Sequence, residues 1–347
     1  MAKRNEPTAQ QLIGPSLLIL AFVAVGAALY FMRPVLVPLV LAILISYLVT
    51  PVVDLVQVRL RVPRAIALTA ALALAGGAIT LLIMLISSSA ASLAAKADLY
   101  QEKLVQMGNT VLALAARIGL PVNSAELEEQ MADLPVGSIL ANVLNSVVAS
   151  ASVLFLVLVF VIYLVAGHSP GERREGMYGE IDRKIRRYLA VKVMMSAVTG
   201  IIVALLLALF GLELAPVFGV LAFLLNFIPS VGSIIATFLP LPLALVQFDN
   251  PFMIVLVLLI PGTFQIAIGN ALEPKLMGTS LNLHPITILL SLIFWGMLWG
   301  LPGMVLAAPI TAVVKIILDR VESTRPIGAL LAGQLPGSPT ADPSCDP

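Results

Sequence analysis

The sequence predicts an all-α, polytopic helical membrane protein with broken or re-entrant segments in its C-terminal third. Of its 347 residues 60% are hydrophobic and only 11% are charged, and the mean hydropathy is +1.04. A soluble domain of this size needs more charge on its surface than this chain carries. The charge-free stretches reach the length of about 20 residues that a membrane helix requires, whereas the alternating ten-residue strands of a membrane barrel are absent.

The gaps between charged residues locate the expected spans. They predict membrane helices near residues 12–32, 35–53, 65–87, 142–166 and 193–211. Further apolar segments lie near 215–229, 232–248, 251–271, 285–300 and 302–318, and some of these are short enough to be re-entrant or broken. The first apolar run is longer than that of a cleaved signal peptide, so we expect it to remain as a span.

Basic residues set the expected orientation. They cluster at the N-terminus, in the loop 59–64, in the segment 172–192 and near the C-terminus, and the predicted spans place all four clusters on one side. Loops rich in Lys and Arg stay cytoplasmic, so both termini should be cytoplasmic. The expected organisation has five regions: 1–87 with three spans, 88–140 as an extracytoplasmic helical projection, 141–192 with a fourth span and a cytoplasmic amphipathic helix, 193–320 as a transport core with broken helices, and 321–347 as a disordered cytoplasmic tail.

Two polar segments leave alternatives open. Apolar residues recur at steps of four and three along 93–118, which is heptad spacing. Such a helix either packs on the rest of its own outer face or forms a coiled-coil-like contact between protomers. The segment 172–192 has an apolar stripe opposite its basic residues, which predicts an interfacial helix on the inner leaflet. Its alternative role is that of a gating lever coupled to the core.

Motifs for soluble chemistry are missing. The chain has no phosphate-binding loop, no H-E-x-x-H and no G-x-S-x-G. Its histidines, His168 and His284, are too far apart for helix-spaced metal ligation, and its only cysteine, Cys345, forms no disulfide framework. We therefore expect no enzyme activity, no catalytic residues, no metal and no cofactor. The net charge of +1 excludes a basic nucleic-acid-binding face.

The C-terminal third contains a repeated pattern. L-x-L-x-P occurs at 212–216 and again at 281–285, and each copy opens an apolar segment that is later interrupted at a glycine. Two related hairpins entering from opposite sides would form an inverted repeat, as in secondary transporters. Chance similarity between Leu- and Ala-rich segments is the alternative. The first interruption spans Asn226–Gly232, where proline and glycine open the helix and leave backbone groups for a ligand or for a packing kink.

Two further clusters are candidate sites. Glu273 and Lys275 are isolated between long apolar stretches, so they either couple transport to a proton or cation or anchor a helix end at the interface. Trp295 and Trp299 share a helix face, and so do two glycines in G-x-x-x-G spacing, which favours close helix packing, with a stacking wall for a ligand as the alternative. The candidate substrate-binding residues are Asn226, Pro229, Ser230, Gly232, Gln265, Gly269, Asn270 and Trp295; the ion-coupling residues are Glu273 and Lys275; the helix-packing residues are Gly296, Gly300, Gly303 and Pro309.

These motifs together resemble the autoinducer-2 exporter family of bacterial membrane proteins. The resemblance rests on the runs 225–232, 269–278, 284–285, 294–304 and 308–309, read as L-N-F-I-P-x-x-G, G-N-x-x-E-P-K-L-M-G, H-P, F-W-G-x-x-W-G-x-x-G-M and A-P, and it extends over about residues 10–320. It implies a homo-oligomer of the bacterial inner membrane with about eight membrane helices, which exports a small polar quorum signal without ATP hydrolysis. Cation/proton antiport has been attributed to relatives, and a non-transporting scaffold built on the outer helix is a third hypothesis.

Overall fold

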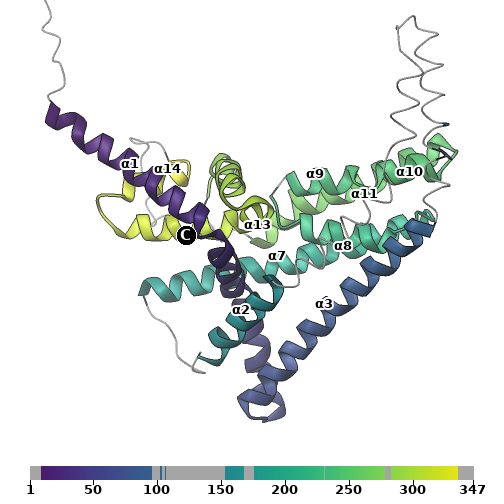
Figure 1. Ribbon diagram of the computed structural model, residues 1–347, viewed down its shortest axis with the longest axis horizontal. Helices are drawn as coiled ribbons and strands as arrows, with labels where there is room; N and C mark the ends of the chain where they lie inside the picture. The colour runs from purple at the N-terminus through teal and green to yellow at the C-terminus, as the bar shows by residue number, and fades with distance from the viewer. Residues whose placement is uncertain are drawn as a thin grey trace, which may run out of the picture.

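The computed structural model describes residues 9–95, 102–103, 106, 153–167, 176–229, 231–277 and 283–334. Within these ranges all regular elements are helices, as the sequence predicts (Figure 1). The first three are α1 (Ala9–Phe31), α2 (Arg33–Leu60) and α3 (Arg64–Ala95). Pro34 starts α2, where its missing N–H costs no helical hydrogen bond, and Arg61 ends it in the left-handed conformation with a φ of 51°.

A bundle of three helices fills the N-terminal half. The apolar helix Val153–Ala166 packs between α2 and α3 through Val157, Val161 and Val165. Small side chains of α2 and α3, including Ala42 and Ala67, allow this close approach. Helix α3 runs along one edge in Figure 1, and its last residues, 88–95, belong to the expected extracytoplasmic projection. Apart from its start in α3 and residues 102–103 and 106, that projection, and with it most of the heptad stripe, lies outside the described residues.

Helix α7 (Gly176–Leu209) passes through the centre of the molecule and packs against five other helices of the described part. It is continuous, so the expected boundary between an amphipathic helix ending at 192 and a span starting at 193 is absent. The apolar stripe expected on the inner leaflet instead packs on protein, because Ile185, Tyr188 and Leu189 are buried against Ala308 and Ala312. The amphipathic segment and the span therefore form one continuous helix.

The first hairpin consists of α8 (Ala215–Leu225), α9 (Val231–Phe238) and α10 (Leu241–Gln247). Its base is closed by Gln247, whose side chain accepts a hydrogen bond from the Glu213 backbone N–H (2.8 Å) and donates one to the Gly211 carbonyl (2.7 Å). At its tip Gly232 lies against Leu225, where a Cβ would be 1.7 Å from the carbonyl oxygen. Glycine is thus required for the two legs to meet.

The connection to the second hairpin is a helix with a widened turn. Helix α11 (Pro251–Ala267) continues through a π-helical segment, η1 (Ile268–Leu272), into α12 (Glu273–Met277). The predicted break at Gly269 and Asn270 is thus a π-bulge, a feature found often at functional sites. Both α11 and α12 contact α7.

The second hairpin is α13 (Pro285–Arg320), which folds back on itself at Gly300 (φ 65°, ψ −144°). Gly303 then lies against the preceding leg, since a Cβ there would be 2.0 Å from the Trp295 carbonyl oxygen. Helix α14 (Arg325–Leu331) follows and packs on α13. The sequence predicts a disordered tail from 321, whereas residues 325–331 are helical because α14 is held by this packing and by the bond from the His284 N–H to the Leu331 carbonyl (3.0 Å).

The two hairpins point toward each other. Ile228 at the tip of the first packs against Leu292, Trp295 and Leu306 of the second. Their bases lie at opposite ends of the molecule, marked in Figure 1 by α10 and α14. Three helices of the described part are long and apolar enough to cross a membrane, namely Arg33–Arg59, Gly176–Leu209 and Pro285–Arg320, and the last of these is the chain that folds back at Gly300.

Candidate transport site

A stripe of polar residues is buried along one face of α7. Lys192, Ser196 and Thr199 are respectively 3%, 0% and 2% exposed, and they follow one another at helical steps of four and three. The Thr199 hydroxyl is satisfied within the helix by the Met195 carbonyl. The side chains of the other two contact residues outside α7, so α7 presents polar groups to the helices packed around it.

Lys192 forms an ion pair with Glu273 of α12. The side chains are 3% and 14% exposed, so the pair is largely shielded from solvent. A buried ion pair is held by mutual attraction that offsets the loss of hydration, and removing one partner leaves an uncompensated charge. The pair therefore couples the position of α12 to that of α7.

One helical turn further along, Ser196 is bonded to the tip of the first hairpin. The Asn226 side-chain amide donates a hydrogen bond of 3.0 Å to the Ser196 hydroxyl, and both residues are buried. Asn226 is also where α8 ends, because its N–H completes the helix and the chain then turns toward Pro229 and Gly232. We name the polar row as the set of Lys192, Glu273, Ser196 and Asn226.

Gln265 of α11 adds a further buried polar group, being 3% exposed. Its amide nitrogen has no hydrogen-bond partner within the described part of the chain. Such a donor is costly to bury unless something binds it. Gly269, one turn on, has open space where a Cβ would project. Ser230 lies outside the described residues, as does the side chain of Asn270.

The tryptophans are turned into the second hairpin. Their ring centroids are 4.9 Å apart, and Trp295 Nε1 donates to the Thr311 hydroxyl (3.3 Å) on the returning leg. Trp299 Nε1 donates to the Leu29 carbonyl of α1 (3.0 Å). These rings tie the hairpin to itself and to α1, and Ile228 links them to the tip that carries Asn226.

The predicted packing residues divide into two kinds. Gly296 lies close to Met304, Gly303 to the Trp295 carbonyl, and Pro309 is fully buried. Gly300 has nothing within 4 Å of a Cβ position and instead makes the turn, which its positive φ reserves for glycine. G-x-x-x-G spacing suggests that both glycines lie on one packing surface. The chain reverses direction at Gly300, so Gly300 is not part of such a surface.

The sequence interpretation missed Lys192 and Ser196. The charge pattern places Lys192 in the basic cytoplasmic segment and pairs Glu273 with Lys275, whereas Lys275 is exposed and Glu273 forms an ion pair with Lys192. The apolar stripe of the segment 172–192 indicates that both residues are buried, because the helical spacing of Ile185 and Leu189 continues through 192 and 196. A lysine on the buried face of an apolar helix requires an acidic partner.

The polar row lies beside interrupted helices. The polar row joins α7 to α12 and to the first hairpin through side chains alone, next to helices interrupted by a π-bulge and by a proline turn. Interrupted helices of this kind leave backbone and side-chain groups for a small polar solute or an ion.

Comparison with known proteins shows the family of this chain. The sequence profile of the AI-2E family transporter matches residues 17–323. The AI-2 transport protein TqsA of Escherichia coli is 30% identical over 313 residues, which cover 87% of this chain and 90% of TqsA. A Haemophilus influenzae protein, whose name gives transport as a provisional role and no substrate, is 28% identical over 90% of this chain and 94% of its own length. The chain belongs to the AI-2E family of transporters.

Proposed function

We propose that this chain exports a small polar metabolite without ATP hydrolysis, and that autoinducer-2 is the first candidate substrate. The polar row is the observation that carries the proposal, because its groups come from three elements and meet in an apolar interior. The name of TqsA supports the choice of substrate. Hydroxyl groups of such a solute would accept a hydrogen bond from the Gln265 amide. They would also replace the hydrogen bond between Asn226 and Ser196 with hydrogen bonds to the solute.

Glu273 is the proposed coupling residue. As a carboxylate it attracts Lys192 and holds α12 against α7. Protonation removes that attraction, so α12 can separate from α7 and open the row toward one side of the membrane. Uptake and release of one proton by Glu273 would then accompany each cycle of access.

Reconstitution into proteoliposomes tests this mechanism. Autoinducer-2 flux should depend on the imposed pH gradient in the parent chain and in Glu322→Gln, a control that removes an exposed carboxylate. Glu273→Gln should lose that pH dependence. Because Glu273→Gln leaves Lys192 unpaired, the double variant Lys192→Met/Glu273→Gln is measured beside it. Unchanged pH dependence in both would contradict the coupling role.

Cation/proton antiport is a second candidate function, favoured by the same ion pair. A cation that binds Glu273 would displace the Lys192 ammonium, so ion and proton compete for one carboxylate. A sodium gradient should then drive proton movement in vesicles that contain no organic solute. Export of autoinducer-2 with no sodium-induced proton flux would exclude this alternative.

We also propose a bacterial inner-membrane location with both termini cytoplasmic, and assembly as a homo-oligomer. Helix α1 supports assembly or lipid contact, since Leu17, Phe22 and Phe31 are all more than half exposed. Cys345 is the only cysteine of the chain. A membrane-impermeant maleimide should therefore label it in inverted vesicles and leave it unlabelled in intact spheroplasts. The reverse pattern would contradict the orientation.

A further inference from the structure

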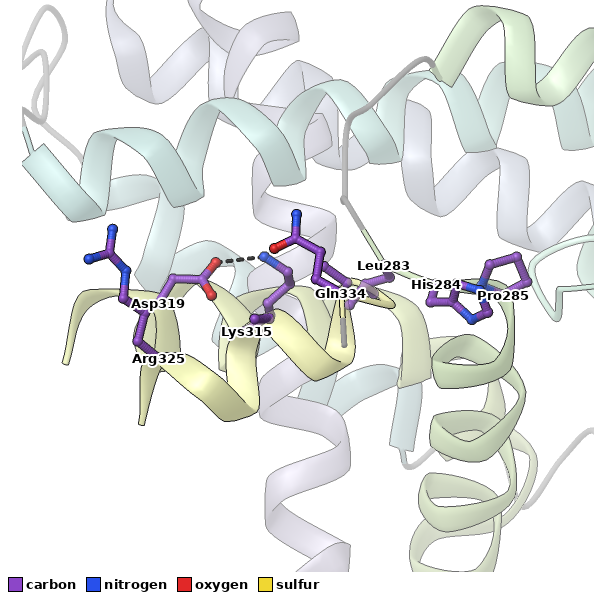
Figure 2. Close-up of a pocket in the computed structure, with 9 residues that line it drawn as sticks. Leu283, His284, Pro285, Lys315, Asp319, Arg325 and Gln334 are labelled. Carbon is purple, nitrogen blue, oxygen red and sulfur yellow. Dashed lines mark hydrogen bonds and ion pairs between the residues drawn. The ribbon is translucent and has the colours of Figure 1, made fainter. Parts of the chain in front are cut away.

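An open cavity of about 630 Å³ with a mixed polar and apolar lining lies at the base of the second hairpin. Three segments line it: the start of α13, the last turns of α13, and α14 with the residues that follow it (Figure 2). Its polar lining consists of His284, Lys315, Asp319, Arg325 and Gln334. No member of the polar row lines it, so it is separate from the site proposed for transport.

The lining carries more positive than negative charge. Lys315 is 9% exposed, and its ammonium donates one hydrogen bond of 2.6 Å to Asp319. Two of its three N–H donors remain. Arg325 is exposed and forms no ion pair within the described part of the chain, so the described lining holds two cations against one carboxylate. A buried lysine with donors to spare favours an anionic occupant.

Two further side chains, His284 and Gln334, add donors to the cavity. His284 Nδ1 accepts the Ile286 N–H (3.3 Å), so the proton of the neutral ring is on Nε2 and can be donated. Gln334 contributes an amide. In Figure 2 Arg325 and His284 lie at opposite ends, with Lys315, Asp319 and Gln334 between them. Donors thus approach from several directions rather than from one surface.

We propose that this cavity binds a phosphate monoester. Three phosphate oxygens can accept from the arginine fork and the lysine together, and Arg binds phosphate through two parallel hydrogen bonds. The volume exceeds that of the phosphate alone and falls within the range of small-molecule sites. Apolar groups such as Leu283 and Ala329 remain for the organic part. The phosphate group belongs either to a soluble metabolite or to a lipid headgroup.

Occupancy would connect the two legs of α13 through α14. Lys315 and Asp319 are on the returning leg, His284 precedes the outgoing leg, and Arg325 belongs to α14. Gly333 already lies against the His284 ring, where a Cβ would be 2.5 Å from Cδ2. A ligand that contacts all three segments fixes their mutual position.

Two probes with the same phosphate group test the proposal on the full chain in phosphatidylcholine nanodiscs. Glycerol 3-phosphate, followed by calorimetry and by the unfolding midpoint, represents a soluble ligand. Phosphatidic acid, counted by native mass spectrometry, represents a headgroup. At least one probe should bind saturably, and Arg325→Gln should weaken that binding at least tenfold. Arg59→Gln, which removes an exposed charge at the end of α2, is the matched control and should leave it unchanged.

The two probes distinguish the two sources of the phosphate group. Binding of glycerol 3-phosphate supports a soluble ligand, and retention of phosphatidic acid alone supports a headgroup. If Arg325→Gln fails to assemble, Arg325→Lys keeps the charge, loses the fork and should still bind more weakly than the parent chain. Glu273→Gln should bind like the parent chain, so failure of the transport proposal leaves this result intact. Absence of saturable binding by both probes, or equal losses in Arg325→Gln and Arg59→Gln, overturns the proposal.

Discussion

The polar row along α7 and the second hairpin satisfy their buried polar groups in different ways. In the row, Lys192 and Glu273 are 81 residues apart, and Asn226 and Ser196 are 30 apart, on helices joined at these points by side chains. In the second hairpin, Trp295 bonds Thr311 of the same element. Two glycines hold the two helical segments of this hairpin together. Gly300 makes the turn at the tip, and Gly303 lies against the Trp295 carbonyl.

This difference separates parts that can move from parts that move as a unit. Shifting α12 or the tip of the first hairpin, where Asn226 lies, relative to α7 breaks the contacts of the row one at a time. Shifting the second hairpin carries its internal contacts with it. Alternating access of a secondary transporter needs both kinds of part, a rigid element and a contact that two states can make and break. The substitutions below test this division, starting with the largest effect.

Lys192→Met should cost the most, about 3–5 kcal/mol of stability, because it leaves the Glu273 carboxylate buried without its partner. Chemical unfolding in detergent measures the loss. Adding Glu273→Gln should recover much of it, since no unpaired charge then remains. Failure of the double variant to recover any stability would show that the pair does not join α12 to α7.

Gly303→Ala should cost about 1–3 kcal/mol, because its methyl group would collide with the Trp295 backbone carbonyl and force the two legs apart. Gly296→Ala is the matched control, since its methyl group meets only the flexible side chain of Met304, 2.9 Å from Cε, and no backbone atom. The unfolding midpoints of the two variants are compared. Equal losses would contradict the view that the hairpin is held by backbone contact at one glycine.

Local patterns in the sequence predict most of the helices and the proline–glycine turn at Asn226–Gly232, because those depend on short-range preferences. They do not predict that Gly300 turns the chain, since G-x-x-x-G spacing reads equally as a packing face. They also do not pair Lys192 with Glu273. Partners so distant along the chain are chosen by tertiary packing, and a charge count assigns Lys192 to its cytoplasmic neighbours.

Helix α14 is another element that local sequence patterns do not predict. Seven residues are too few for a helix to be stable alone in water. Its presence follows from contacts that no local pattern reveals, such as Gly328, which lies so close to the Asp319 side chain that any Cβ would collide with it. The stretch 321–347, rich in proline and glycine, therefore reads as disordered although its start is packed on α13.

Asn226→Ala should cost about 1–3 kcal/mol at most, because it leaves the buried Ser196 hydroxyl without its donor. Its larger effect should be on flux, since the first hairpin loses its polar contact with α7. Ser196→Ala removes the other half of the same bond and should reduce flux to a similar extent. The double variant measured in proteoliposomes should be no slower than either single one. Additive losses would mean that the two residues act separately.

Trp295→Phe should have the smallest effect, about 0.5–1.5 kcal/mol, because it removes one neutral hydrogen bond and keeps an aromatic ring beside Trp299. The bond lies within the second hairpin, so flux per folded molecule should stay unchanged while the unfolding midpoint falls slightly. Thr311→Val, which removes the acceptor, should give the same result. A large loss of flux with normal stability would place Trp295 against the transported solute, and the second hairpin would then be part of the binding site rather than its rigid frame.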